Sequence, residues 1–465
     1  MDGDEVPLET PADFRDEKER IVVISLFSGI GGLEHALRLA GVKPTHLLLV
    51  EKDPDCRRLL RREWPGAELL GDIAQLTRLK IKETIQKGEA TGVLAAGGSP
   101  CQGLSKLSSE RKRLEDARSA LFYEMVRVFK DVKEIAIEEV MWYMTLAENV
   151  VSDEEDIIEM TRALEVRPFL VDSMWLSRSK RPRLFWLSAL LVEAPGVKEI
   201  PHGLYDELRY EVEEFEDMKN VLDRGSSWPS GEQDPELRFP TFTRKIPRRR
   251  PPPSPAGLSS PSEEAKRRWE SYRFCYPPYT FNEEYMVKRG DELRPLNANE
   301  REKLMGYPQW STLNMCKKVP ETMEEQKEAE GMRCSAIGNS FHVVAVAALL
   351  GHALWSFGVK ALKGHKVIWQ EAENQRKRTR DAFMLEVTGG DTPKETNLAS
   401  DTEVEELNGH MEALSPQVPA PRFSEGRYIT EEDKKLASQL VAAFYQEAGV
   451  QELRRPFRHG HHLPA

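Results

Sequence analysis

The sequence predicts an α/β fold built on a doubly wound, mostly parallel sheet, and three observations support this prediction. Apolar, β-branched runs recur along the N-terminal part of the chain without polar alternation, as in strands that are buried on both faces. Stretches with helical apolar spacing separate these runs. Glycine-rich or polar sequences follow several of the runs directly, where α/β folds place their binding sites.

The first unit is a strand at residues 21–27 (IVVISLF), a break at SGIGG, and a helix at 33–41 that stops at Gly41. A helical stripe of apolar residues predicts a further helix over 117–133. The remaining strands are expected at residues 47–50, 92–98, 142–150, 169–176 and 183–191. Strands that alternate with helices in this way are typical of a doubly wound sheet.

The character of the chain changes after residue 192. Residues 193–294 are rich in Pro, Gly, Trp and Tyr and have little periodicity, which predicts a separate, irregular module. A helix is expected at 297–304, where Asn297 caps the first turn and Glu300 closes a capping box. Residues 341–359 carry no formal charge over nearly a membrane-spanning length, but two histidines and a serine interrupt them, so a buried helix at 341–357 is preferred.

Composition limits the class of protein. The net charge of −11 argues against a chain that coats polyanions over its whole surface, but it leaves room for a local basic groove. The five cysteines form no CxxC pair, so we expect neither a disulfide framework nor a metal cluster. No signal peptide or membrane span is expected, and nothing in the sequence indicates a homo-oligomer.

The first strand–loop–helix unit indicates a nucleoside-type cofactor. Gly29 and Gly31 allow close approach of a ligand, and Glu51 ends the next strand, where a carboxylate can accept hydrogen bonds from ribose hydroxyls. The spacing is not GxGxxG, so a nicotinamide cofactor, which needs a diphosphate loop, fits poorly. S-adenosylmethionine is the leading candidate, and a plain tight turn is the alternative.

Catalytic candidates follow the later strands. Cys101 lies in SPCQ directly after a strand, with glycines around it, which favours a nucleophilic thiol over a buried structural cysteine. Glu148 and Asn149 end the next strand, and a carboxyl group among apolar neighbours would have a raised pKa and could donate a proton to a ring nitrogen. Arg181 and Arg183 stand at i and i+2, where they can act as paired donors to a carbonyl oxygen or a phosphate.

These motifs together resemble the cytosine-5 DNA methyltransferases. FSGIGG, Glu51, Asp72, PCQGLS, ENV, RPR and the later GNS at 338–340 have the order and spacing of that family, and the similarity covers about residues 21–191 and 295–358. LFYEMVRVF and RPRLFW are most similar to the de novo type of eukaryotic DNA methyltransferase. One departure is Ser179, which stands where many members carry Gln.

The resemblance implies a Rossmann-like class I methyltransferase sheet into which an irregular target-recognition region is inserted. The expected organisation is a charged leader (1–20), a catalytic core (21–192), the target-recognition region (193–294), the return of the core (295–360), and a largely disordered tail (361–465) with a helix at 430–449. The catalytic residues carried over are Cys101, Glu148, Asn149, Arg181 and Arg183. The cofactor S-adenosylmethionine would contact Phe27, Gly29, Gly31, Glu51, Asp72, Ile73, Pro100, Leu121, Asn339 and Ser340.

The partner implied is DNA, with a cytosine flipped out of the duplex to reach Cys101. The basic run formed by Arg244, Lys245, Arg248, Arg249 and Arg250 is expected to contact the DNA backbone, and a flexible basic linker is the alternative. Nuclear residence is inferred from the substrate and from basic runs. Two rival functions remain, a tRNA cytosine-5 methyltransferase of the same fold and a non-catalytic DNA methyltransferase-like regulator.

Overall fold

The computed structural model of the chain describes residues 19–100, 120–211, 218–227, 238–243 and 285–359, together with residues 215, 262–263, 266–267, 270 and 368. The leader up to residue 18 and the predicted helix at 430–449 lie outside the described residues.

A nine-stranded sheet with the strand order β3-β2-β1-β4-β5-β7-β6-β9-β8 forms the centre of the fold. Its strands are β1 (Ile21–Leu26), β2 (His46–Val50), β3 (Glu68–Leu70), β4 (Gly92–Gly98), β5 (Trp142–Val150), β6 (Pro168–Asp172), β7 (Pro182–Leu187), β8 (Val197–Pro201) and β9 (Asp206–Tyr210). The first five strands pair in parallel, and β7 runs antiparallel between β5 and β6. This topology confirms the predicted Rossmann-like sheet.

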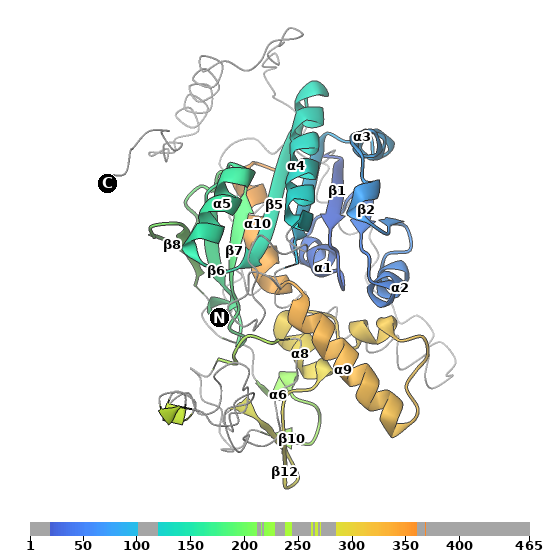
Figure 1. The fold of residues 1–465 in the computed structure, drawn as a ribbon, viewed down its shortest axis with the longest axis vertical. Helices are drawn as coiled ribbons and strands as arrows, with labels where there is room; N and C mark the ends of the chain where they lie inside the picture. Colours follow the sequence, from blue (N-terminus) through green and yellow to red (C-terminus); the bar gives the residue numbers. More distant parts are fainter. Residues whose placement is uncertain are drawn as a thin grey trace, which may run out of the picture. The chain divides into compact units, whose positions relative to one another are not determined.

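Helices cover both faces of the sheet (Figure 1). The helices of the described residues are α1 (Gly32–Leu39), α2 (Pro54–Glu63), α3 (Arg78–Lys87), α4 (Ala120–Glu138), α5 (Glu154–Leu164), α6 (Met218–Val221), α8 (Ala298–Met305), α9 (Met323–Asn339) and α10 (Val343–Ser356). Of these, α6, α8 and α9 lie away from the faces of the sheet, beside β10 (Ser226–Ser227) and β12 (Glu292–Arg294) (Figure 1). Neighbouring residues of β1 pack into two different cores, because strand side chains alternate between faces. Val23 packs with α1 and α10, whereas Val22 packs with α3 and α4.

The sheet continues beyond residue 192, where the sequence analysis places the start of the target-recognition region. Strands β8 and β9 add an antiparallel pair to the edge of the sheet through the parallel pairing of β9 with β6. Their sequences, VKEIP and DELRY, are polar because β8 is the edge strand and both strands are only partly buried, so a search for apolar runs does not find them. We therefore use "the insert" for residues 211–294, which contain α6 and a small sheet of β10 (Ser226–Ser227), β11 (Val287–Arg289) and β12 (Glu292–Arg294).

The return of the chain to the core contains the predicted capping box. The Asn297 side chain accepts a hydrogen bond from the amide of Glu300, and the Glu300 side chain accepts one from the amide of Asn297, both at 2.9 Å. Gly306 ends α8 in the left-handed region with φ of 83°.

The apolar run at 341–357 forms α10, in which twelve of the fourteen residues are buried. Among the described residues, the continuous stretch Met323–Ser356 is long and apolar enough to cross a membrane. It consists of α9 and α10, and the second of these packs into the core against α1. The buried-helix interpretation of this run is therefore confirmed.

Candidate active site

The loop after β1 has three residues in the left-handed backbone region. They are Phe27 and Gly29, each with φ of 55°, and Gly31 with φ of 78°. A Cβ atom at Gly31 would lie 2.4 Å from the Trp64 ring, so the glycine is needed for the packing of α2 against the loop. The left-handed conformation is strained for Phe27, because its Cβ atom crowds the backbone where glycine has none. Such strain is typical of functional loops.

Glu51 ties this loop to the end of β2. One carboxylate oxygen accepts a hydrogen bond from the Gly29 amide at 2.7 Å, and the other accepts one from the Asp53 amide, also at 2.7 Å. Burial raises the pKa of Glu51, and these backbone hydrogen bonds oppose the rise. A carboxylate has about four acceptor positions, so lone pairs remain for the hydroxyls of a ribose.

Asp72 and Ile73 follow β3 at the same edge of the sheet. Asp72 caps a short 3₁₀ helix by accepting from the Ala74 amide at 3.0 Å, and it pairs with Lys52 at 3.2 Å. These two contacts hold the pKa of Asp72 below its usual value. Ile73 is buried and supplies an apolar surface beside the carboxylate.

The other cofactor candidates come from separate elements. Pro100 is half-buried just after β4, and Leu121 lies partly buried at the start of α4. Asn339 is the exposed last residue of α9. Ser340 ends that helix, and its hydroxyl donates to the Ile337 carbonyl at 2.8 Å.

The ends of β4 and β5 form the second half of the site. Cys101 lies outside the described residues, but β4 and the following Ser99 and Pro100 lead to it. Gly98 pairs with Glu148 in the sheet, and a Cβ atom at Gly98 would lie 2.7 Å from a carboxylate oxygen of Glu148. A glycine is therefore required for Glu148 to lie against the strand that leads to Cys101.

Asn149 connects the same two strands on their next residues. Its side-chain amide donates to the Ser99 hydroxyl at 3.1 Å, and both residues are buried. Its side-chain oxygen accepts from the Val150 amide at 2.8 Å. The contact fixes Ser99, two residues before Cys101, to the end of β5.

Glu148 forms an ion pair with Arg183, with 2.8 Å between Oε1 and Nε. Both side chains are 12% exposed. Burial raises the pKa of Glu148, and the positive charges of Arg183 and Arg181 lower it by a smaller amount. The structure thus brings together the carboxyl group and one arginine of the predicted site, and burial makes this carboxyl lose its proton less readily than an exposed glutamate does.

The guanidinium group of Arg181 has different partners. It donates to the carbonyl oxygens of Phe242 at 3.2 Å, Gly338 at 3.1 Å and Ser340 at 2.6 Å. The side chain is 3% exposed. Although the i, i+2 spacing predicts two parallel donors, the structure directs one arginine to Glu148 and the other to backbone carbonyls of the insert and of the 338–340 turn.

The segment that carries most of this site is similar to a known protein family. Residues 21–150 match the family model of the C-5 cytosine-specific DNA methylases. We call residues 21–150 the methylase segment because of this match. The segment contains the loop after β1, Glu51, Asp72, the strand that leads to Cys101, and the Glu148–Asn149 end of β5.

The chain has relatives in plants and bacteria. It is 36% identical over 117 residues to DNA (cytosine-5)-methyltransferase DRM2 of Oryza sativa subsp. japonica, a match that covers 24% of this chain and 19% of the relative. It is also 36% identical over 110 residues to Type II methyltransferase M.AquIA of a Picosynechococcus strain, covering 23% of this chain and 43% of the relative. The match therefore spans less than half of either relative.

Solved structures with a similar fold include the Dnmt2 methyltransferase of S. pombe, at 19% identity and a TM-score of 0.42 over 72% of this chain and 98% of that one. The methyltransferase EhMeth of Entamoeba histolytica has 15% identity and a TM-score of 0.43 over the same shares of the two chains.

Phe341 is a site residue that the sequence analysis missed. Cβ atoms added at Gly32 and at Gly98 would each meet its side chain, at 3.0 Å and 2.9 Å respectively. The Phe341 side chain therefore lies between the start of α1 and the end of β4, that is, between the two halves of the candidate site. The only signal in the sequence is its place directly after GNS, where the apolar run concealed it.

A buried polar pair lies behind the loop of the methylase segment. Glu34 is 3% exposed and lies beside Ser25, and burial raises its pKa to about 7. His35 is fully buried between the rings of Trp64 and Tyr307, and burial lowers its pKa. The two residues occupy a helix whose other buried positions are mostly apolar, so sequence spacing gave no signal for them.

The predicted DNA contacts Arg244, Lys245 and Arg248–Arg250 lie outside the described residues. The stretch just before them, 238–243, is described and is held against the segment that precedes β7. The Phe239 amide donates to the Arg178 carbonyl at 2.7 Å, and the Lys180 amide donates to the Phe239 carbonyl at 2.8 Å. The Thr241 hydroxyl donates to the Lys180 carbonyl at 2.8 Å. The basic run therefore follows a backbone anchored close to Arg181.

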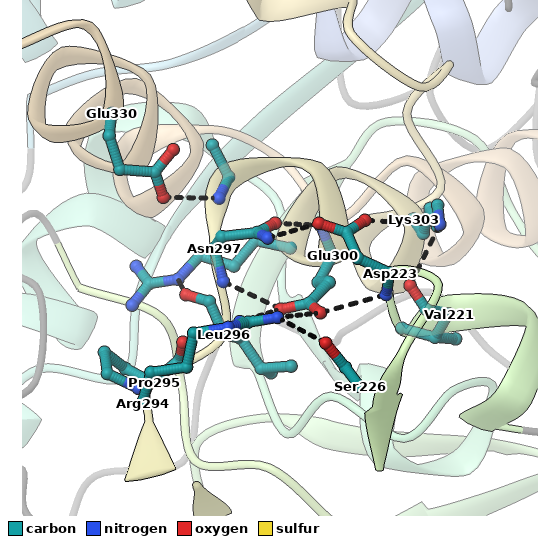
Figure 2. Close-up of polar contacts among 12 residues, drawn as sticks. Val221, Asp223, Ser226, Arg294, Pro295, Leu296, Asn297, Glu300, Lys303 and Glu330 are labelled. Atoms are coloured by element: carbon teal, nitrogen blue, oxygen red, sulfur yellow. Dashed lines mark hydrogen bonds and ion pairs between the residues drawn. The ribbon is translucent and has the colours of Figure 1, made fainter. Parts of the chain in front are cut away.

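Glu300 fixes both ends of the insert to α8 (Figure 2). Its carboxylate accepts two hydrogen bonds from Arg294, at 2.7 and 2.8 Å, and one from the Asp223 amide at 3.1 Å. Arg294 also donates to the Ser226 hydroxyl at 2.9 Å, and the Asn297 amide group donates to the Asp223 carboxylate at 2.6 Å. Glu300 is fully buried, so the cluster that joins the insert to the core is centred on a carboxylate removed from solvent.

No group of His, Cys, Asp and Glu side chains suited to a metal ion occurs within the part of the chain that the structure describes.

Proposed function

We propose that this chain transfers a methyl group from S-adenosylmethionine to carbon 5 of a cytosine in DNA, through a covalent adduct with Cys101. The observation that supports this most is the buried Glu148–Arg183 pair. Glu148 lies against Gly98 at the strand end that leads to the thiol. It falls within residues 21–150, which match the methylase family model, whereas Arg183 comes from β7 beyond them.

The residues at the ends of β1, β2 and β3 fit the cofactor. The left-handed Gly29 leaves open space for a ligand, since a Cβ there would meet nothing nearer than a backbone oxygen at 3.8 Å. Glu51 would accept from the ribose hydroxyls, and Asp72 with Ile73 would hold the adenine. S-adenosylmethionine, when bound, supplies an electrophilic methyl group.

The chain's own residues would prepare the base for that group. Carbon 5 of cytosine is too weak a nucleophile unaided, so the Cys101 thiolate adds to carbon 6 and makes carbon 5 an enamine carbon. Protonated Glu148 donates to ring nitrogen 3 and stabilises the charge that develops, and Arg183 supports Glu148. Once carbon 5 carries the methyl group, its proton passes to solvent water, the double bond between carbons 5 and 6 re-forms, and the bond from carbon 6 to the Cys101 sulfur breaks to release the thiolate. A thiol at a sheet edge is reached only by a base that has left the duplex.

Replacement of Cys101 tests the covalent step. We expect Cys101→Ser to abolish methyl transfer and to bind S-adenosylhomocysteine with the affinity of the wild type in calorimetry. Cys316→Ser, which changes a half-buried cysteine in the turn before α9, serves as the matched control and should retain the rate. Full activity of Cys101→Ser would remove the covalent mechanism. Parallel assays on duplex DNA and on tRNA decide the substrate, and transfer to tRNA alone would contradict the DNA assignment.

The basic run at 244–250 is proposed to contact the nucleic-acid backbone. Replacing Arg248, Arg249 and Arg250 with Gln should reduce the slope of log affinity against log salt by about 0.9 for each lost phosphate contact. The same charge change in the tail, at Arg376, Lys377 and Arg378, is the control and should leave the slope unchanged. Equal slopes for the first variant and the wild type would make the run a spacer.

A further inference from the structure

We propose that Arg181 is a positioning residue that links the insert to the 338–340 turn, and that this link makes nucleic-acid binding and cofactor binding depend on each other. The inference rests on the proposed function, because both ligands belong to that function. It differs from the role expected from sequence, in which Arg181 donates directly to the base or to a phosphate.

The contacts of the guanidinium group define the link. One terminal nitrogen of Arg181 donates to the Phe242 carbonyl of the insert, and the other donates to the Gly338 and Ser340 carbonyls of the turn. The three acceptors lie 61, 157 and 159 residues away along the chain. One cation therefore holds together two segments that the chain itself does not connect locally.

Arg181 is itself held rigidly. Its amide donates to the Asp172 carboxylate at 2.8 Å, and that same oxygen accepts from the Met174 amide at 3.1 Å. The residue before it, Lys180, pairs with the insert through the Phe239 carbonyl at 2.8 Å. A displacement of residues 239–242 therefore acts directly on the backbone and on the side chain at Arg181.

The turn connects this link to the cofactor half of the site. Ser340 and Asn339 are the cofactor candidates at the end of α9. The next residue, Phe341, lies between Gly32, which begins α1 directly after the first loop, and Gly98 at the end of β4. The Phe341 carbonyl also accepts a hydrogen bond from the Tyr307 hydroxyl at 3.3 Å. A ligand that orders the loop after β1 would thus favour one position of the turn and, through Arg181, one position of the insert.

The chemistry of arginine suits this task. Its planar group presents donors in a fixed fork, so it can address carbonyls from two segments at once, whereas the single ammonium of lysine reaches fewer of them. Carbonyl dipoles around the group compensate for the loss of water at a side chain that is 3% exposed. Removing the group should therefore uncouple the two segments without creating a new contact between them.

The test measures coupling directly. Fluorescence anisotropy measures the affinity of the full chain for a fluorescein-labelled, cytosine-containing DNA duplex, with and without saturating S-adenosylhomocysteine. Calorimetry measures the affinity for S-adenosylhomocysteine alone. For the wild type we expect saturating S-adenosylhomocysteine to tighten DNA binding by about 5–150-fold, the usual range of coupling between sites. We call the DNA affinity with S-adenosylhomocysteine divided by the affinity without it the coupling ratio. In Arg181→Gln we expect this ratio to fall to about 1, and in Arg181→Lys we expect an intermediate ratio because part of the contact set survives.

Arg178→Gln is the matched control. Arg178 is an equally buried arginine of the same segment, at 6% exposed, and lies over the ring of Phe215 in the insert. We expect this variant to lose stability while keeping the wild-type coupling ratio, which separates the link from general damage to the fold.

The outcomes distinguish this inference from the proposed function. A wild-type coupling ratio in Arg181→Gln overturns the inference, and if that variant does not fold, a wild-type ratio in Arg181→Lys does the same. A wild type that binds S-adenosylhomocysteine and DNA without any coupling also overturns the inference while the proposed function stands. A wild type that binds no S-adenosylhomocysteine overturns both.

Discussion

Oε1 of Glu148 lies 2.8 Å from Nε of Arg183, at the carboxyl edge of a sheet where both side chains are largely removed from solvent. Two opposing effects act on the Glu148 carboxyl group. Burial raises its pKa, and the adjacent guanidinium lowers it. The balance decides the fraction of Glu148 that carries the proton needed for donation to a ring nitrogen.

Removal of Arg183 should therefore shift the pH dependence of methyl transfer. Without the positive charge the pKa of Glu148 rises further, so the loss of activity as Glu148 deprotonates moves to higher pH. We expect Arg183→Met to show this shift in single-turnover rates measured across pH. Arg183→Lys, which keeps the charge, should have a descending limb close to that of the wild type. A limb of Arg183→Met at unchanged or lower pH would contradict the assigned role of Glu148.

Glu51 should be more important for cofactor binding than its neighbour Asp53. Glu51→Ala removes the carboxylate that accepts from Gly29 and would accept from the ribose, and a hydrogen bond to a charged group is worth about 1.5–3 kcal/mol. We therefore expect calorimetry to show that the binding free energy of S-adenosylhomocysteine is weaker by about 1.5–3 kcal/mol in this variant. Asp53→Ala removes the cap of α2, which accepts from the Asp55 and Cys56 amides, and should cost stability but not affinity. If both variants lost the same affinity for S-adenosylhomocysteine, Glu51 would act by stabilising the fold and not by contacting the cofactor.

The sequence predicts the strands of the core well because they are buried on both faces. Gly92–Gly98 is predicted to the residue, and the capping box of Asn297 and Glu300 is confirmed, because both depend on local chemistry. Helix α9 is missed because its buried residues, Ala329, Arg333, Cys334 and Ile337, form no apolar stripe. Arg333 instead pairs with the buried Glu302 at 3.1 Å, a contact that sequence spacing does not reveal.

The same distinction holds at the site. Glu51, Asp72, Glu148 and Asn149 could be placed from sequence, since each lies at the end of a parallel strand or within two residues after it. The partners of Arg181 could not, because they are backbone carbonyls more than sixty residues away. Phe341 could not be predicted either, because an aromatic residue at the start of an apolar run is indistinguishable by sequence from a core residue.

Glu34 should make the stability of the fold depend on pH. Its pKa rises from an ordinary 4.5 to about 7 on folding, so the folded state binds the proton more tightly than the unfolded chain. The free energy of unfolding therefore falls as pH rises through this window, by about 3 kcal/mol for a shift of this size. We expect Glu34→Gln to remove this contribution in urea unfolding at pH 5 and pH 8.

Glu328→Gln, at an exposed position of α9, is the control for the Glu34 measurement and should keep the wild-type difference between the two pH values. If Glu34→Gln also keeps that difference, the Glu34 carboxyl does not carry a proton in the folded state near neutral pH.

The contact between the insert and the core should depend on the buried ion pair of Glu300 with Arg294. Glu300 and Glu207 each form a two-pronged ion pair, with Arg294 and Arg209 respectively. The Glu300 side chain is fully buried and that of Arg294 is 14% exposed, whereas the second pair is 20% and 38% exposed. Glu300→Gln leaves a buried guanidinium without its charge partner, so we expect a loss of about 3–5 kcal/mol in urea unfolding. Glu207→Gln should cost about 1 kcal/mol or less, because solvent screens that pair.

Glutamine can still close the capping box with Asn297, so the loss at Glu300 reports the ion pair and not the helix cap. The double variant Glu300→Met with Arg294→Met removes both charges and should recover part of the loss, because no buried charge is then left without a partner. Similar losses for Glu300→Gln and Glu207→Gln, or no recovery in the double variant, would show that α8 holds the insert by packing alone.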